Sequence, residues 1–300
     1  MASPPDLVCV GHLVREMIHF PDRAEGPFLG SPPAYCSVAA ARQGTATGLV
    51  TRIGPDMPDA LLRPLMEAGV DITGLHRSGR TTLSELHYDV HGNKEICYPA
   101  KADAIKAHDV PESFRGCRMI YVCTMDNDVL PADLPAVVAC GQTSAVDLGG
   151  YGGAHISKAH REELDSPEEL ACRVSGHFKI VKASDEDAKL IFGSDDPDAA
   201  AEKILACGSE VVVITAGPKG AFVYAGKNHW HIPPIPGFVL DTTGGGDTFM
   251  AGFLSEYLHT YDPLKSAQWG AATALCVIEK TGGVRLERMP TRDQVQCRIV

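Results

Sequence analysis

The chain has 300 residues, with 27 Lys and Arg against 38 Asp and Glu, and a formal net charge of −11 at pH 7. This length fits one large α/β domain or two ordinary ones. The acidic balance disfavours a binder of nucleic acid or of anionic membranes, because such a protein needs a basic surface. No run of the sequence approaches the roughly 18 apolar residues of a membrane span, and the N-terminal residues lack the pattern of a secretory signal. We therefore expect a cytoplasmic protein.

Ten cysteines are present, and none of them forms a C-x-x-C pair. Several lie inside apolar runs, such as Cys9 in LVCV and Cys123 in MIYVC, where a free thiol behaves as a small apolar group. We expect buried, reduced thiols rather than a zinc site or a disulfide framework.

Short apolar runs alternate with helical patterns along most of the chain. Strands are predicted at 7–10, 47–54, 118–123, 144–148, 178–183 and 210–217, and helices at 33–43, 59–68, 158–175, 185–193, 197–207 and over most of 240–300. Pro64 weakens the second helix, because proline lacks an amide donor. Strands that are apolar nearly throughout indicate a parallel sheet covered on both faces. The pattern predicts a single α/β domain over residues 1–300, with a doubly wound, mostly parallel sheet flanked by helices.

Two stretches interrupt this alternation and are predicted as antiparallel strands. They are residues 12–31 and residues 81–99, and the second contains His-Gly-Asn, a turn signal, between two strand-like runs. Ligands of open α/β sheets bind at the carboxyl ends of the strands. The two excursions therefore form either a small β lid over that edge or a decorative extension of the sheet.

The segment DTTGGGDTFMAGF at 241–253 carries the clearest chemical signal. Gly244, Gly245 and Gly246 precede an amphipathic helical run, and a glycine loop that opens a helix presents amide N–H groups and the helix dipole to an anion. Asp247 would repel a phosphate bound there. A general base that takes a proton from an attacking hydroxyl explains its position better than an ordinary helix cap does.

This segment resembles the second motif of the ribokinase family of carbohydrate kinases, also called the phosphofructokinase-B family. The common form is D-T-T-G-A-G-D-x-F, and Gly245 stands here in place of the alanine. Weaker similarities at 8–11, 29–44, 50–56, 211–224 and 267–282 follow in the family's order. The resemblance implies a ribokinase-like fold and an ATP- and Mg²⁺-dependent kinase that phosphorylates a hydroxyl of a small polyhydroxylated molecule.

The resemblance also implies roles for individual residues. Gly244, Gly245 and Gly246 match the loop that holds the transferring phosphoryl group, and Asp247 matches the catalytic base. The ATP site is implied at Thr215, Gly217, Lys219, Gly220 and Ser184. Asp187 stands in place of a glutamate linked to Mg²⁺ through water, and it fits a plain helix cap equally well. Asp241 matches a residue near a monovalent-cation site, which makes K⁺ a further candidate.

The acceptor side departs most from the family pattern. Glu16, Gly30, Ser31 and Tyr35 fall where the family binds its substrate, and Ser31 and Tyr35 replace the usual glycine and asparagine. A sugar, an inositol-like polyol and a nucleoside all stay open as acceptors. A catalytically silent sugar- or nucleotide-binding regulator is the alternative from another class. A homodimer formed through the lid is a further expectation.

Overall fold

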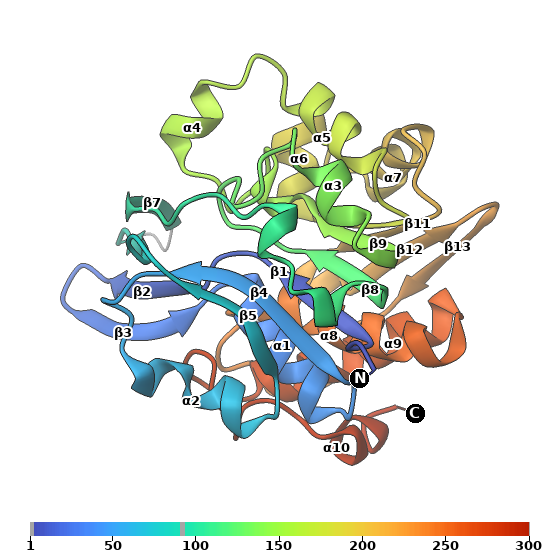
Figure 1. The fold of residues 1–300 in the computed structure, drawn as a ribbon. Helices are drawn as coiled ribbons and strands as arrows, with labels where there is room; N and C mark the ends of the chain where they lie inside the picture. The colour runs from blue at the N-terminus through green and yellow to red at the C-terminus, as the bar shows by residue number, and fades with distance from the viewer. Residues whose placement is uncertain (1–2, 91–93, 300) are drawn as a thin grey trace.

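The computed structural model describes residues 3–90 and 94–299, and Figure 1 shows its fold. The main sheet has nine strands in the order β13-β12-β11-β10-β9-β8-β1-β4-β5. Their bounds are β1 Leu7–Val10, β4 Thr47–Ile53, β5 Asp71–Arg77, β8 Cys117–Val122, β9 Gly141–Asp147, β10 Ile180–Ser184, β11 Val211–Thr215, β12 Ala221–Ala225 and β13 Asn228–Ile232. The strands from β11 to β5 are all parallel, and β12 and β13 join antiparallel at one edge. The predicted doubly wound, mostly parallel sheet is confirmed.

Helices cover both faces of this sheet (Figure 1). Their bounds are α1 Pro32–Arg42, α2 Asp59–Glu67, α3 Leu134–Val138, α4 Lys158–Glu162, α5 Pro167–Ser175, α6 Asp185–Phe192, α7 Pro197–Ala206, α8 Gly245–Thr260, α9 Pro263–Ile278 and α10 Arg292–Gln296. Successive side chains of a strand point to opposite faces. Cys9 of β1 accordingly packs with α1 and α8, whereas its neighbour Val8 belongs to the apolar cluster that α5 and α7 complete. None of the helices in the described ranges is long and apolar enough to cross a membrane.

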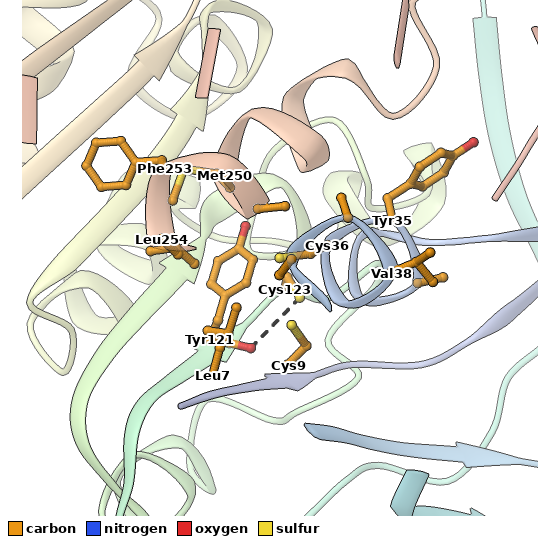
Figure 2. Close-up of a cluster of buried hydrophobic side chains, with 14 of the residues drawn as sticks. Leu7, Cys9, Tyr35, Cys36, Val38, Tyr121, Cys123, Met250, Phe253 and Leu254 are labelled. Atoms are coloured by element: carbon orange, nitrogen blue, oxygen red, sulfur yellow. Dashed lines mark hydrogen bonds between the residues drawn. The ribbon is translucent and has the colours of Figure 1, made fainter. Parts of the chain in front are cut away.

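The core beneath α1 and α8 determines how the start of each helix meets the sheet. Figure 2 shows Tyr121 of β8 and Leu7 of β1 on one side, with Met250 and Leu254 of α8 packed over them. Cys9, Cys36 and Cys123 lie in the same cluster and are free and buried, as expected for reduced thiols. The tight packing of both helices on the central strands brings their N-termini to the carboxyl edge of the sheet.

A second sheet of four strands stands beside the first, in the order β3-β2-β6-β7. It consists of β2 (Val14–His19), β3 (Ala24–Gly30), β6 (Thr82–Tyr88) and β7 (Lys94–Ala100). The β2–β3 and β6–β7 pairs are antiparallel, and β2 joins β6 in parallel. The two interruptions of the α/β pattern thus form one sheet, which we call the lid sheet. The expected turn at 91–93 lies outside the described residues.

The helix predicted over 158–175 is wrong as a single element. The chain forms α4 and α5 separately, because Ser166 caps a new helix and Pro167 opens it. Proline at the first helical position starts a helix rather than continuing one. Strand β5 and helix α3 were not predicted from the sequence. Pro64 is tolerated within α2, a helix of nine residues.

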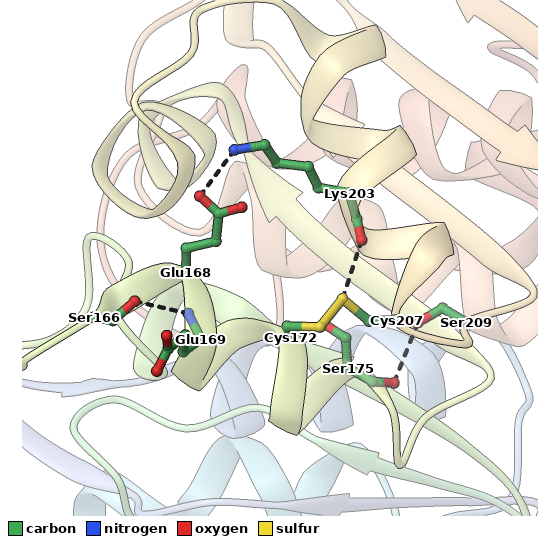
Figure 3. The surroundings of a disulfide bond; sticks show 8 residues. All are labelled: Ser166, Glu168, Glu169, Cys172, Ser175, Lys203, Cys207 and Ser209. Carbon is green, nitrogen blue, oxygen red and sulfur yellow. Dashed lines mark hydrogen bonds and ion pairs between the residues drawn. A yellow bond between two sulfur atoms is a disulfide. The ribbon is translucent and has the colours of Figure 1, made fainter.

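The expectation that the cysteines are all reduced is also wrong. Cys172 of α5 and Cys207, which follows α7, form a disulfide that closes a separation of 35 residues (Figure 3). Lys203 and Glu168 join the same two helices through an ion pair of 2.8 Å. The two cysteines lie far apart in the sequence, and no spacing motif signals their pairing.

Candidate active site

The glycine loop before α8 has the geometry of an anion site. Gly244 adopts φ 76°, which favours glycine, and the helix begins at Gly245. A Cβ on Gly244 would lie 2.4 Å from the ring of Tyr35, so a larger residue cannot replace it without displacing that ring. Thr248 closes the first turn by donating its amide to the Gly244 carbonyl at 2.9 Å. The first amides of a helix lack intrahelical partners and point along the positive end of its dipole. An anion bound there would meet these donors.

Asp247 lies in the first turn of α8 and is partly exposed. Burial raises the pKa of its carboxyl group; Asp147 and Asp187 act in the same direction, and His155 and Lys182 oppose them. A carboxylate with a raised pKa holds a transferred proton more readily than an ordinary aspartate does. The environment of Asp247 therefore suits a general base.

A buried lysine lies next to this loop. Lys182 belongs to β10, and the strand register places it opposite Asp147 of β9. Its ammonium group lies 3.0 Å from the Asp147 carboxylate and 3.7 Å from that of Asp187. Although burial lowers the pKa of Lys182, the surrounding carboxylates raise it overall, so the side chain is charged. A Cβ on Gly246 would lie 3.7 Å from the ammonium nitrogen. One fixed positive charge is thus close to the anion site.

The residues predicted for the acceptor lie together at the junction of the lid sheet and α1. Glu16 of β2 is 7% exposed, and a Cβ on Gly30 would lie 3.1 Å from its carboxylate. Ser31 has φ 99°, a strained value for a residue with a side chain, and its buried hydroxyl has no hydrogen-bond partner among the described residues. Tyr35, one turn into α1, is buried, and burial raises the pKa of its hydroxyl. Ser31 offers a hydroxyl that a ligand could satisfy.

A cavity of about 460 Å³ opens between the lid sheet and residues 239–243, which lead into the glycine loop. Its lining includes Glu16 and Tyr35, the loop residues 241–243 and the segment 281–283. Aromatic side chains form its wall on the side of the lid sheet; they are Phe20, Phe28 and Tyr88. Phe20 stacks on Tyr88 with their ring centroids 5.4 Å apart. The volume suits a small molecule.

The residues predicted for ATP lie on the other side of the loop, where β11 ends. Thr215 is the last residue of β11, and a Cβ on Gly246 would lie 3.9 Å from its hydroxyl. Gly217 and Gly220 have φ 49° and 86°, and a Cβ on Gly220 would meet the Ile232 carbonyl at 2.1 Å. Lys219 is exposed between them. This turn therefore requires both glycines, and it follows Thr215, whose hydroxyl lies beside Gly246.

Ser184 and Asp187 form a capping box at the start of α6. The Ser184 hydroxyl accepts from the Asp187 amide at 3.0 Å, and the Asp187 carboxylate accepts from the Ser184 amide at 2.6 Å. Its other oxygen accepts from the Ala154 amide at 2.8 Å, and the residue is 1% exposed. Both carboxylate oxygens are thus held by backbone donors below the surface. This arrangement is that of a helix cap, and a contact of Asp187 with the water shell of Mg²⁺ stays a proposal.

Asp241 connects the glycine loop to the segment that follows α9. Its carboxylate accepts from the amides of Thr243 at 2.9 Å and Gly282 at 3.2 Å. The guanidinium of Arg288 lies 3.3 Å from the same carboxylate. A second cation does not fit beside this buried guanidinium, so the residues present do not form a K⁺ site.

The sequence predicts the glycine loop and the residues on both sides of it, but not the charged side chains buried around the loop. The residues predicted for ATP lie near Gly246, and those predicted for the acceptor lie near Tyr35. No individual role is predicted from the sequence for Lys182, Asp147, His155 or Arg288. A charged residue in an otherwise apolar strand was the available signal for Lys182 in FKIVKA and for Asp147 in SAVDL. Arg288 carried no comparable signal.

Comparison with known proteins identifies the family of this protein. The family model described as pfkB family carbohydrate kinase matches residues 6–291. A cytidine kinase of Thermococcus kodakarensis is 28% identical over 283 residues, covering 92% of this chain and 97% of that protein. A fructokinase of Escherichia coli is 28% identical over 261 residues, covering 82% of each chain.

Solved structures have the same fold. A putative ribokinase II of E. coli superposes with a TM-score of 0.80 at 19% identity, covering 99% of each chain. A pyrophosphate-dependent kinase of the ribokinase family, complexed with a pyrophosphate analogue and myo-inositol, gives 0.80 at 17% identity, covering 97% of this chain and 99% of its own.

The chain belongs to the pfkB family of carbohydrate kinases. It is a phosphotransferase whose acceptor is a hydroxyl group. The resemblance inferred from residues 241–253 is confirmed.

Proposed function

We propose that this kinase transfers the γ-phosphoryl group of ATP to a hydroxyl of a small sugar or polyol. The observation that carries the proposal is the position of Asp247, whose carboxylate stands in the first turn of α8 directly after the amides of Gly244–Gly246. Mg²⁺ would arrive with ATP, bound by its phosphates and by water, as this ion usually is. None of the steps below depends on a resident metal.

Proton transfer is assigned to Asp247. Its carboxylate accepts the proton of the acceptor hydroxyl while the oxygen attacks the γ-phosphorus and the bond to the leaving ADP breaks. The raised pKa of Asp247 favours holding that proton. The amides at the start of α8 and the Lys182 ammonium face the charge on the transferring group. Catalysis of this kind is mainly positioning and charge stabilisation.

The acceptor is assigned to the cavity between the lid sheet and the glycine loop. The carboxylate of Glu16 lines this cavity and is suited to sugar or inositol hydroxyls, because it accepts hydrogen bonds. The buried hydroxyl of Ser31, unpartnered among the described residues, lies at the same junction but does not line the cavity. Closure of the lid sheet would exclude water, which would otherwise take the phosphoryl group.

A nucleoside is the second candidate acceptor. The aromatic wall formed by Phe20, Phe28 and Tyr88 supports it, because aromatic rings stack on nucleobases. The similarity to a cytidine kinase over nearly the whole chain supports the same reading. The ribose would then present its hydroxyl to Asp247, and the base would lie against the lid sheet.

A coupled assay of phosphoryl transfer tests the proposal. The purified protein is given ATP or pyrophosphate as donor and a panel of sugars, inositols and nucleosides as acceptors. Turnover with ATP and at least one acceptor supports the proposal. Turnover with pyrophosphate alone rejects ATP as the donor. Ligand binding without turnover, with every pair, would favour the catalytically silent binder.

Phe20→Ala distinguishes the two acceptor classes. Losing one stacking contact should raise the KM of a nucleoside about tenfold, with kcat nearly unchanged. The KM of a sugar should change far less. His87→Ala is the matched control, because His87 lies on the same sheet and does not line the cavity. Equal effects of Phe20→Ala and His87→Ala on a nucleoside KM would reject the stacking role.

Two further expectations stay proposals. One is a homodimer formed through the lid sheet, which light scattering of the purified protein tests. The other is a cytoplasmic location. The Cys172–Cys207 disulfide argues against this location in a mesophilic organism, because the cytosol of mesophiles keeps most thiols reduced.

A further inference from the structure

Arg288 is the largest fully buried side chain among the described residues, with an exposure of 1%. Its guanidinium donates to the carbonyl oxygens of two separate segments. From the C-terminal segment these are Val277 at 3.1 Å, Lys280 at 3.0 Å and Gly282. From the glycine-loop segment they are Asp241 at 3.1 Å and Thr243 at 2.9 Å. Five backbone carbonyls thus converge on one side chain.

Such a group of carbonyl oxygens is what a dehydrated monovalent cation requires, since carbonyls replace its water shell. The Asp241 carboxylate, 3.3 Å from the guanidinium, adds a negative charge. A guanidinium carries one positive charge and five hydrogen-bond donors in a rigid plane. The Arg288 guanidinium therefore supplies the positive charge that a monovalent cation would bring, contacts the same carbonyl oxygens and fills the space between them.

The Arg288 side chain lies next to the loop that leads to Asp247. Thr243 is followed directly by Gly244, and Asp247 lies in the first turn of α8. A guanidinium NH group also lies 3.4 Å from the hydroxyl of Tyr35, whose ring packs against Gly244. Arg288 therefore touches both the chain entering the anion site and the ring that supports it.

We propose that Arg288 is a built-in cation that holds the 241–247 loop in place, so that this kinase works without a monovalent ion. Arg288 is a positioning residue, because its contacts are to the loop backbone. The proposal concerns the loop and not the acceptor. Its thermal readout therefore stands even if the acceptor or the donor proposed above is wrong.

The first test uses the unmodified protein in KCl, NaCl, CsCl or choline chloride at equal ionic strength. We expect the same thermal midpoint and the same kcat in all four salts. A specific rise of either quantity with K⁺ over choline would overturn the proposal, because it would reveal an ion site that Arg288 does not fill. This test requires no variant to fold.

The second test uses Arg288→Ala, with Arg285→Ala as the matched control. Arg285 lies on the same segment and is exposed. Arg288→Ala should lower the thermal midpoint by several degrees and kcat at least about tenfold, and K⁺ but not choline should restore part of either. Arg285→Ala should behave as wild type in every salt. A folded Arg288→Ala protein that keeps wild-type kcat, or that ignores K⁺, would overturn the proposal.

Discussion

The ammonium group of Lys182 lies 3.0 Å from the carboxylate of Asp147, and both side chains are buried at the carboxyl edge of the sheet. Their strands are parallel neighbours in register, so the pair is built into the sheet rather than carried on a loop. Asp187 and Asp247 add two further carboxylates around the same lysine. The site thus holds one lysine among three carboxylates, and an incoming phosphate adds to that negative charge.

Removing this lysine charge should slow the transfer. Lys182→Met keeps the length of the side chain and lacks the charge, so the anion site loses the buried positive charge beside Gly246. We expect kcat to fall by about 10²–10³, as for loss of one preorganised electrostatic contact. Steady-state kinetics with ATP and the best acceptor measures the change.

Lys179→Met is the matched control for this variant. Lys179 directly precedes β10, its side chain is 54% exposed, and its ion pair is with Glu210 on the surface. Such exposed pairs contribute little, so kcat should stay within about a factor of two. If both variants keep wild-type kcat while remaining folded, Lys182 serves the stability of the sheet and not the reaction.

The rate should depend on pH through Asp247. Only the deprotonated carboxylate can accept the hydroxyl proton, and burial raises the pKa of this group above its ordinary value of 3.8. The enzyme is therefore active at pH values above the raised pKa of Asp247, and its rate falls as the pH drops through that pKa. A profile of kcat/KM in wild-type protein should show an acid limb whose midpoint lies above 3.8. An acid limb at or below that value would place the proton on another group.

The disulfide should stabilise the fold without affecting the reaction. Cys172→Ser opens a loop of 35 residues, and chain entropy predicts a loss of at most about 4 kcal/mol. Cys172 lies in the second half of α5 and Cys207 directly follows α7 (Figure 3), whereas the site lies at the carboxyl ends of the strands. We expect a lower thermal midpoint with unchanged kcat and KM, and the same shift when wild type is reduced.

Cys297→Ser provides the comparison, because Cys297 is exposed and free. Its thermal midpoint should match that of wild type under oxidising and reducing conditions. An equal midpoint for Cys172→Ser and wild type would show that the disulfide is absent from the protein in solution.

The sequence predicts the parts of this enzyme that depend on local pattern. Apolar runs such as LVCV identify the central strands, and 241–253 identifies the phosphoryl-transfer loop, because glycines and an aspartate at a helix start have few other uses. Contacts between distant segments are different. The five carbonyls around Arg288 come from two segments about 40 residues apart in the chain, and only the folded structure brings them to one point.

The same limit explains the errors on α4 and α5 and on the disulfide. Ser166-Pro167 is a helix start inside a longer helical pattern, and periodicity alone does not separate the two helices. Cys172 and Cys207 face one another only because α5 and α7 pack on the same side of the sheet. The Ser184 and Asp187 pattern fitted a metal site and a helix cap equally, and the structure shows the capping box.

Asp247→Asn tests the central claim most directly. Asparagine keeps the size and capping ability of the side chain, cannot accept the hydroxyl proton, and removes a charge that opposes the incoming phosphates. Loss of a positioned general base should lower kcat by about 10²–10⁴. Calorimetry should show ATP bound as tightly as in wild type or more tightly, because a like charge is gone. A folded variant that keeps more than about a tenth of wild-type kcat would contradict the account, since the hydroxyl would then lose its proton to another group.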